Sequence, residues 1–67
     1  MKLKHEPYNK FKGKLRELGL TYADIAKTLS ISETAVSHKV NGRSDFNLTE
    51  VDKIGIEYGI SRDIFLN

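Results

Sequence analysis

The chain is short, has no cysteine and carries a small positive charge. Its 67 residues allow one domain with a single hydrophobic core, and the formal net charge is +2. The absence of cysteine excludes disulfides and thiolate metal sites. The two histidines lie too far apart in the sequence to form a zinc site alone, so we expect no metal or other cofactor. No apolar run approaches the roughly 18 residues of a membrane-spanning helix, and the N-terminal stretch MKLKHEPYNK lacks the apolar core of a signal peptide.

The charge is divided unevenly along the chain. Residues 1–43 carry nine Lys and Arg against four acidic residues, whereas residues 44–67 carry two against five. Such a division suggests that one side of the molecule faces a polyanion and the other side faces a different partner. Uneven charge also arises by chance in small proteins, so charge alone leaves nucleic-acid binding open.

The hydrophobic pattern predicts five helical segments and no strand. The first covers about residues 8–18, where apolar side chains recur at helical spacing and Gly19 follows as a stop signal. Its apolar stripe consists of Tyr8, Phe11, Leu15 and Leu18. The second covers about residues 22–29 after Thr21 as N-cap, and the third about residues 33–41 after Ser32 as N-cap.

The fourth and fifth segments follow in the acidic half. Asn47 and Glu50 form a capping-box pattern for a helix at about residues 48–58, and Ser61 precedes a last short helical turn at about residues 62–66. The predicted inner stripe of the fourth segment is Leu48, Val51, Ile54 and Tyr58. We assign residues 1–67 to one domain in which residues 1–6 form a flexible basic tail, with an arm on DNA as the alternative reading of Lys2 and Lys4.

The third predicted helix carries an unusual polar face. Val36 and Val40 lie about 40° apart on a helical wheel and would face the core. Short or medium donors and acceptors cluster between about 100° and 200° from Val36, namely Thr34, Ser37, His38 and Asn41. Such groups suit base edges in a DNA major groove, which is wide enough to admit a helix. The basic and polar residues Lys39, Asn41, Arg43 and Ser44 follow at the helix exit, where they suit phosphates.

The order and spacing of these residues resemble a known family. The segment TYADIAKTLSISETAVSHKVNGRSDFNLTEVDKIGIEYGIS is similar to the helix-turn-helix domain of the phage Cro and lambda-repressor-like (Xre) family, especially small regulators of Gram-positive phages and prophages. The resemblance covers about residues 11–66 and rests on a small residue in the second helix, a series of apolar positions, and the stretch from Ser37 to Gly42. The small residue is Ala26, and the apolar positions are Ile25, Leu29, Ile31, Val36 and Val40. Ser30 departs from the family, in which many members have Gly in the turn.

The resemblance implies an all-α, compact, five-helix lambda-repressor-like DNA-binding domain with a helix-turn-helix at about residues 22–41. By position, the base contacts fall on Glu33, Thr34, Ser37 and His38. The phosphate contacts fall on Thr21 and Tyr22 before the motif and on Asn41, Arg43 and Ser44 after it, to which the charge pattern adds Lys39. Two readings stay open, because Glu33 also suits the positive end of its helix and His38 also suits an ordinary surface position.

The function that follows is sequence-specific binding of double-stranded operator DNA by a Cro-like transcriptional repressor in the cytoplasm of a bacterial host cell. A homodimer on a two-fold operator is expected, through Ile56, Ile60, Phe65 and Leu66 unless all four belong to the core. The alternative is a protein-interaction regulator, either an antirepressor or an antitoxin, built on the same scaffold. We expect no enzyme and no small-molecule ligand, since no acid, base or nucleophile arrangement is evident and adjacent Ser37 and His38 would not face each other on a helix.

Overall fold

Helices account for all the regular secondary structure in the described part of the chain. The computed structural model describes residues 3–66, in which four α-helices and one 3-10 turn occur without a strand. They are α1 (Asn9–Leu18), α2 (Tyr22–Leu29), α3 (Glu33–Asn41), α4 (Leu48–Tyr58) and the 3-10 turn η1 (Arg62–Phe65). The predicted all-α class is confirmed. The fifth predicted helical segment is a single 3-10 turn instead of an α-helix, because its four residues cannot build a ladder of i→i−4 bonds.

Local capping signals set where the helices begin. The Thr21 hydroxyl accepts a hydrogen bond from the Asp24 backbone N–H, and the Asp24 carboxylate accepts one from the Thr21 N–H. Asn47 and Glu50 form the same reciprocal capping box at α4. Each box satisfies N–H groups that the first helical turn leaves without a partner, which explains why the predicted starts of α2 and α4 are confirmed.

Three residues, Ser30 to Ser32, connect α2 to α3. Ser30 is the only non-glycine residue with positive φ in the described chain, at φ 58° and ψ 42°. In this left-handed conformation the Ile31 N–H donates to the Ala26 carbonyl oxygen at 3.0 Å, which closes the end of α2. A left-handed residue with a Cβ costs about 1–2 kcal/mol, so Ser30 makes this turn under more strain than a Gly would.

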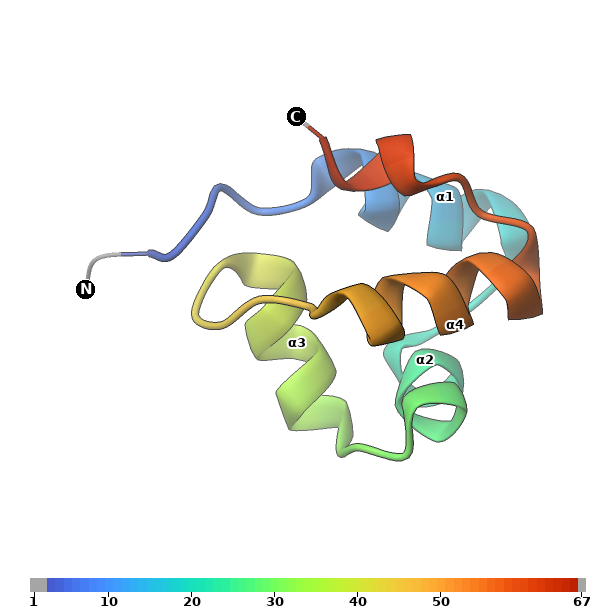
Figure 1. Ribbon diagram of the computed structural model, residues 1–67, viewed down its shortest axis with the longest axis horizontal. Helices are drawn as coiled ribbons and strands as arrows, with labels where there is room; N and C mark the ends of the chain where they lie inside the picture. The colour runs from blue at the N-terminus through green and yellow to red at the C-terminus, as the bar shows by residue number, and fades with distance from the viewer. Residues whose placement is uncertain (1–2, 67) are drawn as a thin grey trace.

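The core lies between α1 and η1, at the top of Figure 1, and the helices α2, α3 and α4 below them, because buried residues from α1, α2, α3 and α4 form one cluster. Ile25, Val36, Val40 and Ile54 are fully buried there. Aromatic rings fill the space between α1, η1 and the loop before α4. The ring centroids of Phe11 and Phe65 lie 4.9 Å apart, and those of Phe46 and Phe65 lie 5.4 Å apart. The buried helix faces therefore fix which side of α3 remains outside.

Two residues of the predicted apolar stripes are exposed instead. Leu48 is 74% exposed and Leu18 is 44% exposed. Leu48 stands six positions before the fully buried Ile54, which places it about 120° away around the helix. The prediction that Leu48 faces the core is therefore wrong. Phe46, in the loop before α4, is buried in the core and was not in any predicted stripe.

Candidate nucleic-acid interface

The polar residues of α3 share the side of the helix that the core leaves free. Val36 and Val40 are fully buried, whereas Glu33 and Thr34 are exposed and Ser37 and His38 are half-buried at its edge. Within residues 3–66, the side chains of Glu33, Thr34 and His38 have no hydrogen-bond or ion-pair partner. The structure thus brings the predicted reading residues together, and three of them have polar groups available to another molecule.

Ser37 and Asn41 differ because they bind each other. The Asn41 Nδ2 donates to the Ser37 carbonyl oxygen at 2.9 Å and lies 3.4 Å from the Ser37 hydroxyl. These contacts hold the Asn41 side chain against the last turn of α3. A DNA contact by either residue would have to keep this bond or replace it, so their predicted roles remain the least supported of the set.

The loop after α3 presents Arg43. The backbone N–H groups of Arg43 and Ser44 both donate to the His38 carbonyl oxygen, at 2.9 and 3.3 Å, so the loop folds back on the helix end. The Arg43 side chain is exposed and makes no ion pair or hydrogen bond within the described chain. An unpaired guanidinium at the exit of α3 is well suited to a phosphate, which it can bind through two parallel hydrogen bonds.

Lys39 has a partner inside the fold. Its Nζ donates to the Glu50 Oε1 at 2.9 Å and to the Asp45 carbonyl oxygen at 3.3 Å. The side chains of Lys39 and Glu50 are only 19% and 13% exposed. Taking Lys39 to a phosphate would leave the Glu50 carboxylate without its countercharge, so we assign Lys39 to linking α3 with α4 and leave it out of the proposed phosphate contacts.

A second basic surface lies at the start of α2. A groove of about 340 Å³ is lined by α1 residues and by the predicted clamps Thr21 and Tyr22. The α1 residues include Lys12 and Arg16, neither of which has an ion-pair partner within residues 3–66. Thr21 is exposed, while Tyr22 is half-buried against the core. Lys12 and Arg16 were not among the predicted phosphate contacts, because only their place beside the start of α2 in one groove distinguishes them from other surface cations.

A cluster at the N-terminal segment was also missed. The Tyr8 hydroxyl donates to Asp45 Oδ1 at 2.5 Å, and the His5 ring stacks on the Tyr8 ring with centroids 4.1 Å apart. Burial of Tyr8, together with its hydrogen bond to the negative Asp45, raises the pKa of the phenol well above its ordinary value. Partners 37 positions apart leave no local pattern in the sequence, so no signal there could have found the pair.

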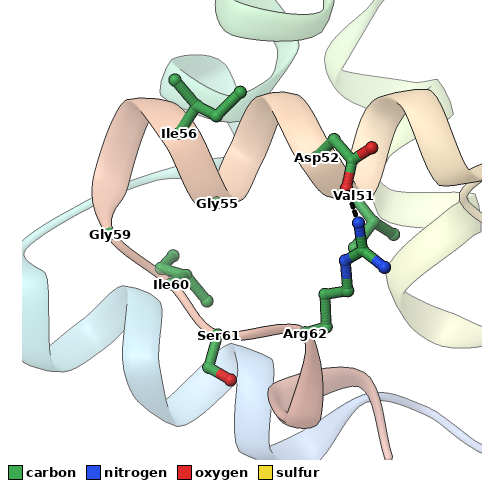
Figure 2. A pocket seen from close by; sticks show the side chains of 8 residues that line it. All are labelled: Val51, Asp52, Gly55, Ile56, Gly59, Ile60, Ser61 and Arg62. Atoms are coloured by element: carbon green, nitrogen blue, oxygen red, sulfur yellow. Dashed lines mark hydrogen bonds and ion pairs between the residues drawn. The ribbon is translucent and has the colours of Figure 1, made fainter.

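The residues predicted for a homodimer separate into two groups. Ile60 is 5% exposed and Phe65 packs against the core, so both serve the fold. Ile56 and Leu66 are 85% and 65% exposed. Ile56 borders a groove of about 620 Å³ between the end of α4 and η1. Figure 2 shows the Arg62 side chain reaching from η1 to Asp52 on α4, to which it is hydrogen-bonded. An apolar side chain beside a hollow makes this face, which we call the α4 groove, the better candidate for a protein contact.

Comparison with known proteins adds no relative. No family model matches the chain, and no curated protein or solved structure matches it. Within residues 3–66, no helix is both long and apolar enough to cross a membrane. The same residues contain no group of three or more His, Asp or Glu side chains that could hold a metal ion. The function must therefore be inferred from the residues and their geometry.

Proposed function

We propose that the protein is a sequence-specific DNA-binding transcriptional regulator, a Cro-like repressor that acts in the cytoplasm of a bacterial host cell. In this proposal α2 and α3 form a helix-turn-helix within a lambda-repressor-like domain, and α3 enters the major groove of an operator. The observation that carries it is the outer face of α3. That face displays Glu33, Thr34 and His38, all without partners in the described chain, on a helix held by two fully buried valines.

The chemistry of that face favours base edges over plain solvation. A helix that only meets water usually displays long charged side chains, whereas Thr34 and His38 are short groups that donate, accept or pack against a methyl group. Glu33 can accept from a cytosine amino group, although its place in the first turn also suits the helix dipole. Phosphate contacts would come from Arg43 and Ser44 on one side and from Thr21 and Tyr22 on the other.

The groove beside α2 extends the phosphate-binding part of the proposal. Lys12 and Arg16 line it without partners in the described chain. Cations at both ends of the α2–α3 unit would neutralise several phosphates. Each neutralised phosphate makes the fall of log affinity with log salt concentration steeper by about 0.9. DNA binding should therefore weaken steeply as salt is raised.

A homodimer through the α4 groove would complete the recognition. To read two half-sites, the α3 helices of such a dimer would have to lie about 34 Å apart, one turn of DNA, a separation close to the 31 Å length of one copy. Ile56 is the apolar contact in this arrangement. The Asp52–Arg62 pair beside it is more than 45% exposed on both side chains and can exchange between copies. The same surface would serve the alternative function, in which the partner is another protein and no DNA is bound.

Selection from random duplexes tests the proposal without assuming any operator sequence. The protein is incubated with a pool of duplexes of about 30 base pairs, long enough for two half-sites, and the bound fraction is amplified and sequenced. We expect a two-fold symmetric consensus and, by fluorescence anisotropy, affinity that falls steeply with salt. Failure to enrich any sequence, together with weak and salt-insensitive binding, would support the protein-interaction alternative.

Variants then assign the roles of individual residues. Thr34→Ala and His38→Ala should each weaken binding to the selected sequence by about 1–3 kcal/mol and leave binding to random duplex almost unchanged. Arg43→Ala should weaken both kinds of binding equally, as expected for a phosphate contact. Lys53→Ala, which removes an exposed charge from α4, is the matched control. Wild-type affinity of the Thr34→Ala and His38→Ala proteins for the selected sequence would refute the site assignment.

A further inference from the structure

The N-terminal segment docks on the loop that follows α3. The Lys4 N–H donates to the Gly42 carbonyl oxygen at 2.7 Å, and the Tyr8 N–H donates to the Val40 carbonyl oxygen at 3.0 Å. The tail predicted at residues 1–6 thus includes residues that are hydrogen-bonded to the loop, while Lys2 lies outside the described residues. These contacts run beside the loop that carries Arg43.

Gly42 makes this close approach possible. It has φ +96°, a conformation that side chains other than glycine's rarely adopt. A Cβ on Gly42 would also collide with the His5 carbonyl oxygen. The same glycine therefore ends α3 and leaves room for the N-terminal backbone, so the two segments depend on each other.

His5 connects the segment to the loop through its side chain. Its Nε2 donates to the Ser44 carbonyl oxygen at 2.9 Å and lies 3.5 Å from Asp45 Oδ1. Asp45 Oδ1 also accepts from the Tyr8 hydroxyl and from the Phe46 N–H. The His5 side chain is only 14% exposed and stacks on Tyr8, so its ring is held on one side while it binds the loop on the other.

We propose that His5 is a positioning residue for phosphate binding: by donating to the Ser44 carbonyl beside the Asp45 carboxylate, it fixes the loop backbone from which Arg43 reaches DNA. This inference rests on the proposed DNA-binding function. His5 itself does not contact the nucleic acid. Its contribution is to reduce the number of loop conformations, so that less conformational entropy is lost when Arg43 engages a phosphate.

A double-mutant cycle tests the coupling between His5 and Arg43. His5→Ala should weaken binding to random duplex about 3-fold to 10-fold and make the salt dependence of log affinity shallower by about 0.9, as we also expect for Arg43→Ala. The double variant should lose little more than either single variant, because a disordered loop and a missing guanidinium remove the same contact. His5→Gln, whose amide N–H can still reach the Ser44 carbonyl, should recover most of the affinity.

Amide exchange in the free protein provides a readout that needs no DNA. In His5→Ala the Lys4 and Arg43 N–H groups should exchange faster, while the amides around the buried Ile54 should keep their wild-type rates. Two results would overturn the inference: unchanged affinity and salt slope in His5→Ala, or strictly additive losses in the double variant. If the wild-type protein itself binds no DNA, the proposed function fails, and faster exchange in His5→Ala would then show only that His5 orders the loop.

Discussion

Helices α3 and α4 are built alike but present opposite surfaces. Each begins at a polar cap whose side chain accepts from a backbone N–H three residues on. Fully buried branched residues anchor both helices, namely Val36 and Val40 in α3 and Ile54 in α4. The outer face of α3 carries unpartnered polar groups, whereas that of α4 carries the exposed Ile56 beside a groove that the Asp52–Arg62 ion pair also lines. The difference shows that two helices with the same kind of cap and anchor can leave surfaces of different chemistry exposed on one small scaffold.

The largest expected effect comes from truncating the inner and outer isoleucines of α4 in turn. Ile54→Ala should lower the free energy of unfolding by about 2–5 kcal/mol, because it leaves a cavity among fully buried side chains. Ile56→Ala, the matched control on the exposed face, should change it by no more than about 0.5 kcal/mol. Urea titration at low protein concentration measures both. A large loss in Ile56→Ala would mean that this face is already covered in solution.

The link between the two helices gives the next effect. Lys39→Met removes the ammonium that binds Glu50 but keeps much of the length of the side chain. We expect a loss of about 1–3 kcal/mol in the free energy of unfolding, between the values for exposed and buried ion pairs. The salt slope of DNA binding should stay at the wild-type value. A slope reduced by about 0.9 would instead return Lys39 to the phosphate contacts.

Tyr8 allows a test at alkaline pH with a smaller effect. In the unfolded chain the phenol ionises near its ordinary pKa of about 10, whereas in the folded protein burial and Asp45 raise its pKa, so that the folded state keeps the proton. The unfolded state then binds fewer protons, and stability must fall as the pH rises above about 10. Tyr8→Phe should cost about 1 kcal/mol at neutral pH and show a shallower alkaline decline. Urea titrations at a series of pH values measure this decline. If the free energy of unfolding fell equally with pH in both proteins, the assignment would be contradicted.

The smallest effect concerns the connection between α2 and α3. Ser30→Gly should raise the free energy of unfolding by up to about 1 kcal/mol, because glycine adopts positive φ without the strain of a Cβ. Ser30→Ala keeps the Cβ and should bring no gain, which separates the backbone effect from loss of the hydroxyl. Thermal unfolding of both variants measures these changes in stability. If Ser30→Gly were less stable than the wild type, the left-handed backbone at this position would be in question.

Much of the helical framework could be predicted because its signals are local. Thr21 with Asp24 and Asn47 with Glu50 lie within three residues of each other, so their caps are visible in the sequence, and the starts of α2 and α4 follow. The side of α3 that faces outward could also be predicted, because Val36 and Val40 fix its inner side. The predicted base and phosphate contacts themselves remain predictions until DNA binding is measured.

What could not be predicted depends on residues distant in sequence. His5 and Ser44 are 39 positions apart, and no periodic pattern connects a ring near the N-terminus to a carbonyl in a loop. In the sequence, nothing distinguishes Lys39 from a free cation near Arg43. Only the folded structure shows that Glu50, 11 positions later, binds it. Leu48 belongs to an apolar series by spacing, but the three-dimensional arrangement leaves its side of α4 exposed.

The docked N-terminal segment has a practical consequence for labelling. Because the Lys4 N–H and the His5 side chain bind the loop beside Arg43, a tag or fluorophore attached near this end sits next to the proposed phosphate contact. The C-terminal side is no better separated from this region, because the Phe65 ring of η1 lies 5.3 Å from the Tyr8 ring and 5.4 Å from the Phe46 ring. A probe that reports on DNA binding should therefore be attached away from both segments, so that it does not compete for the surface that it is meant to measure.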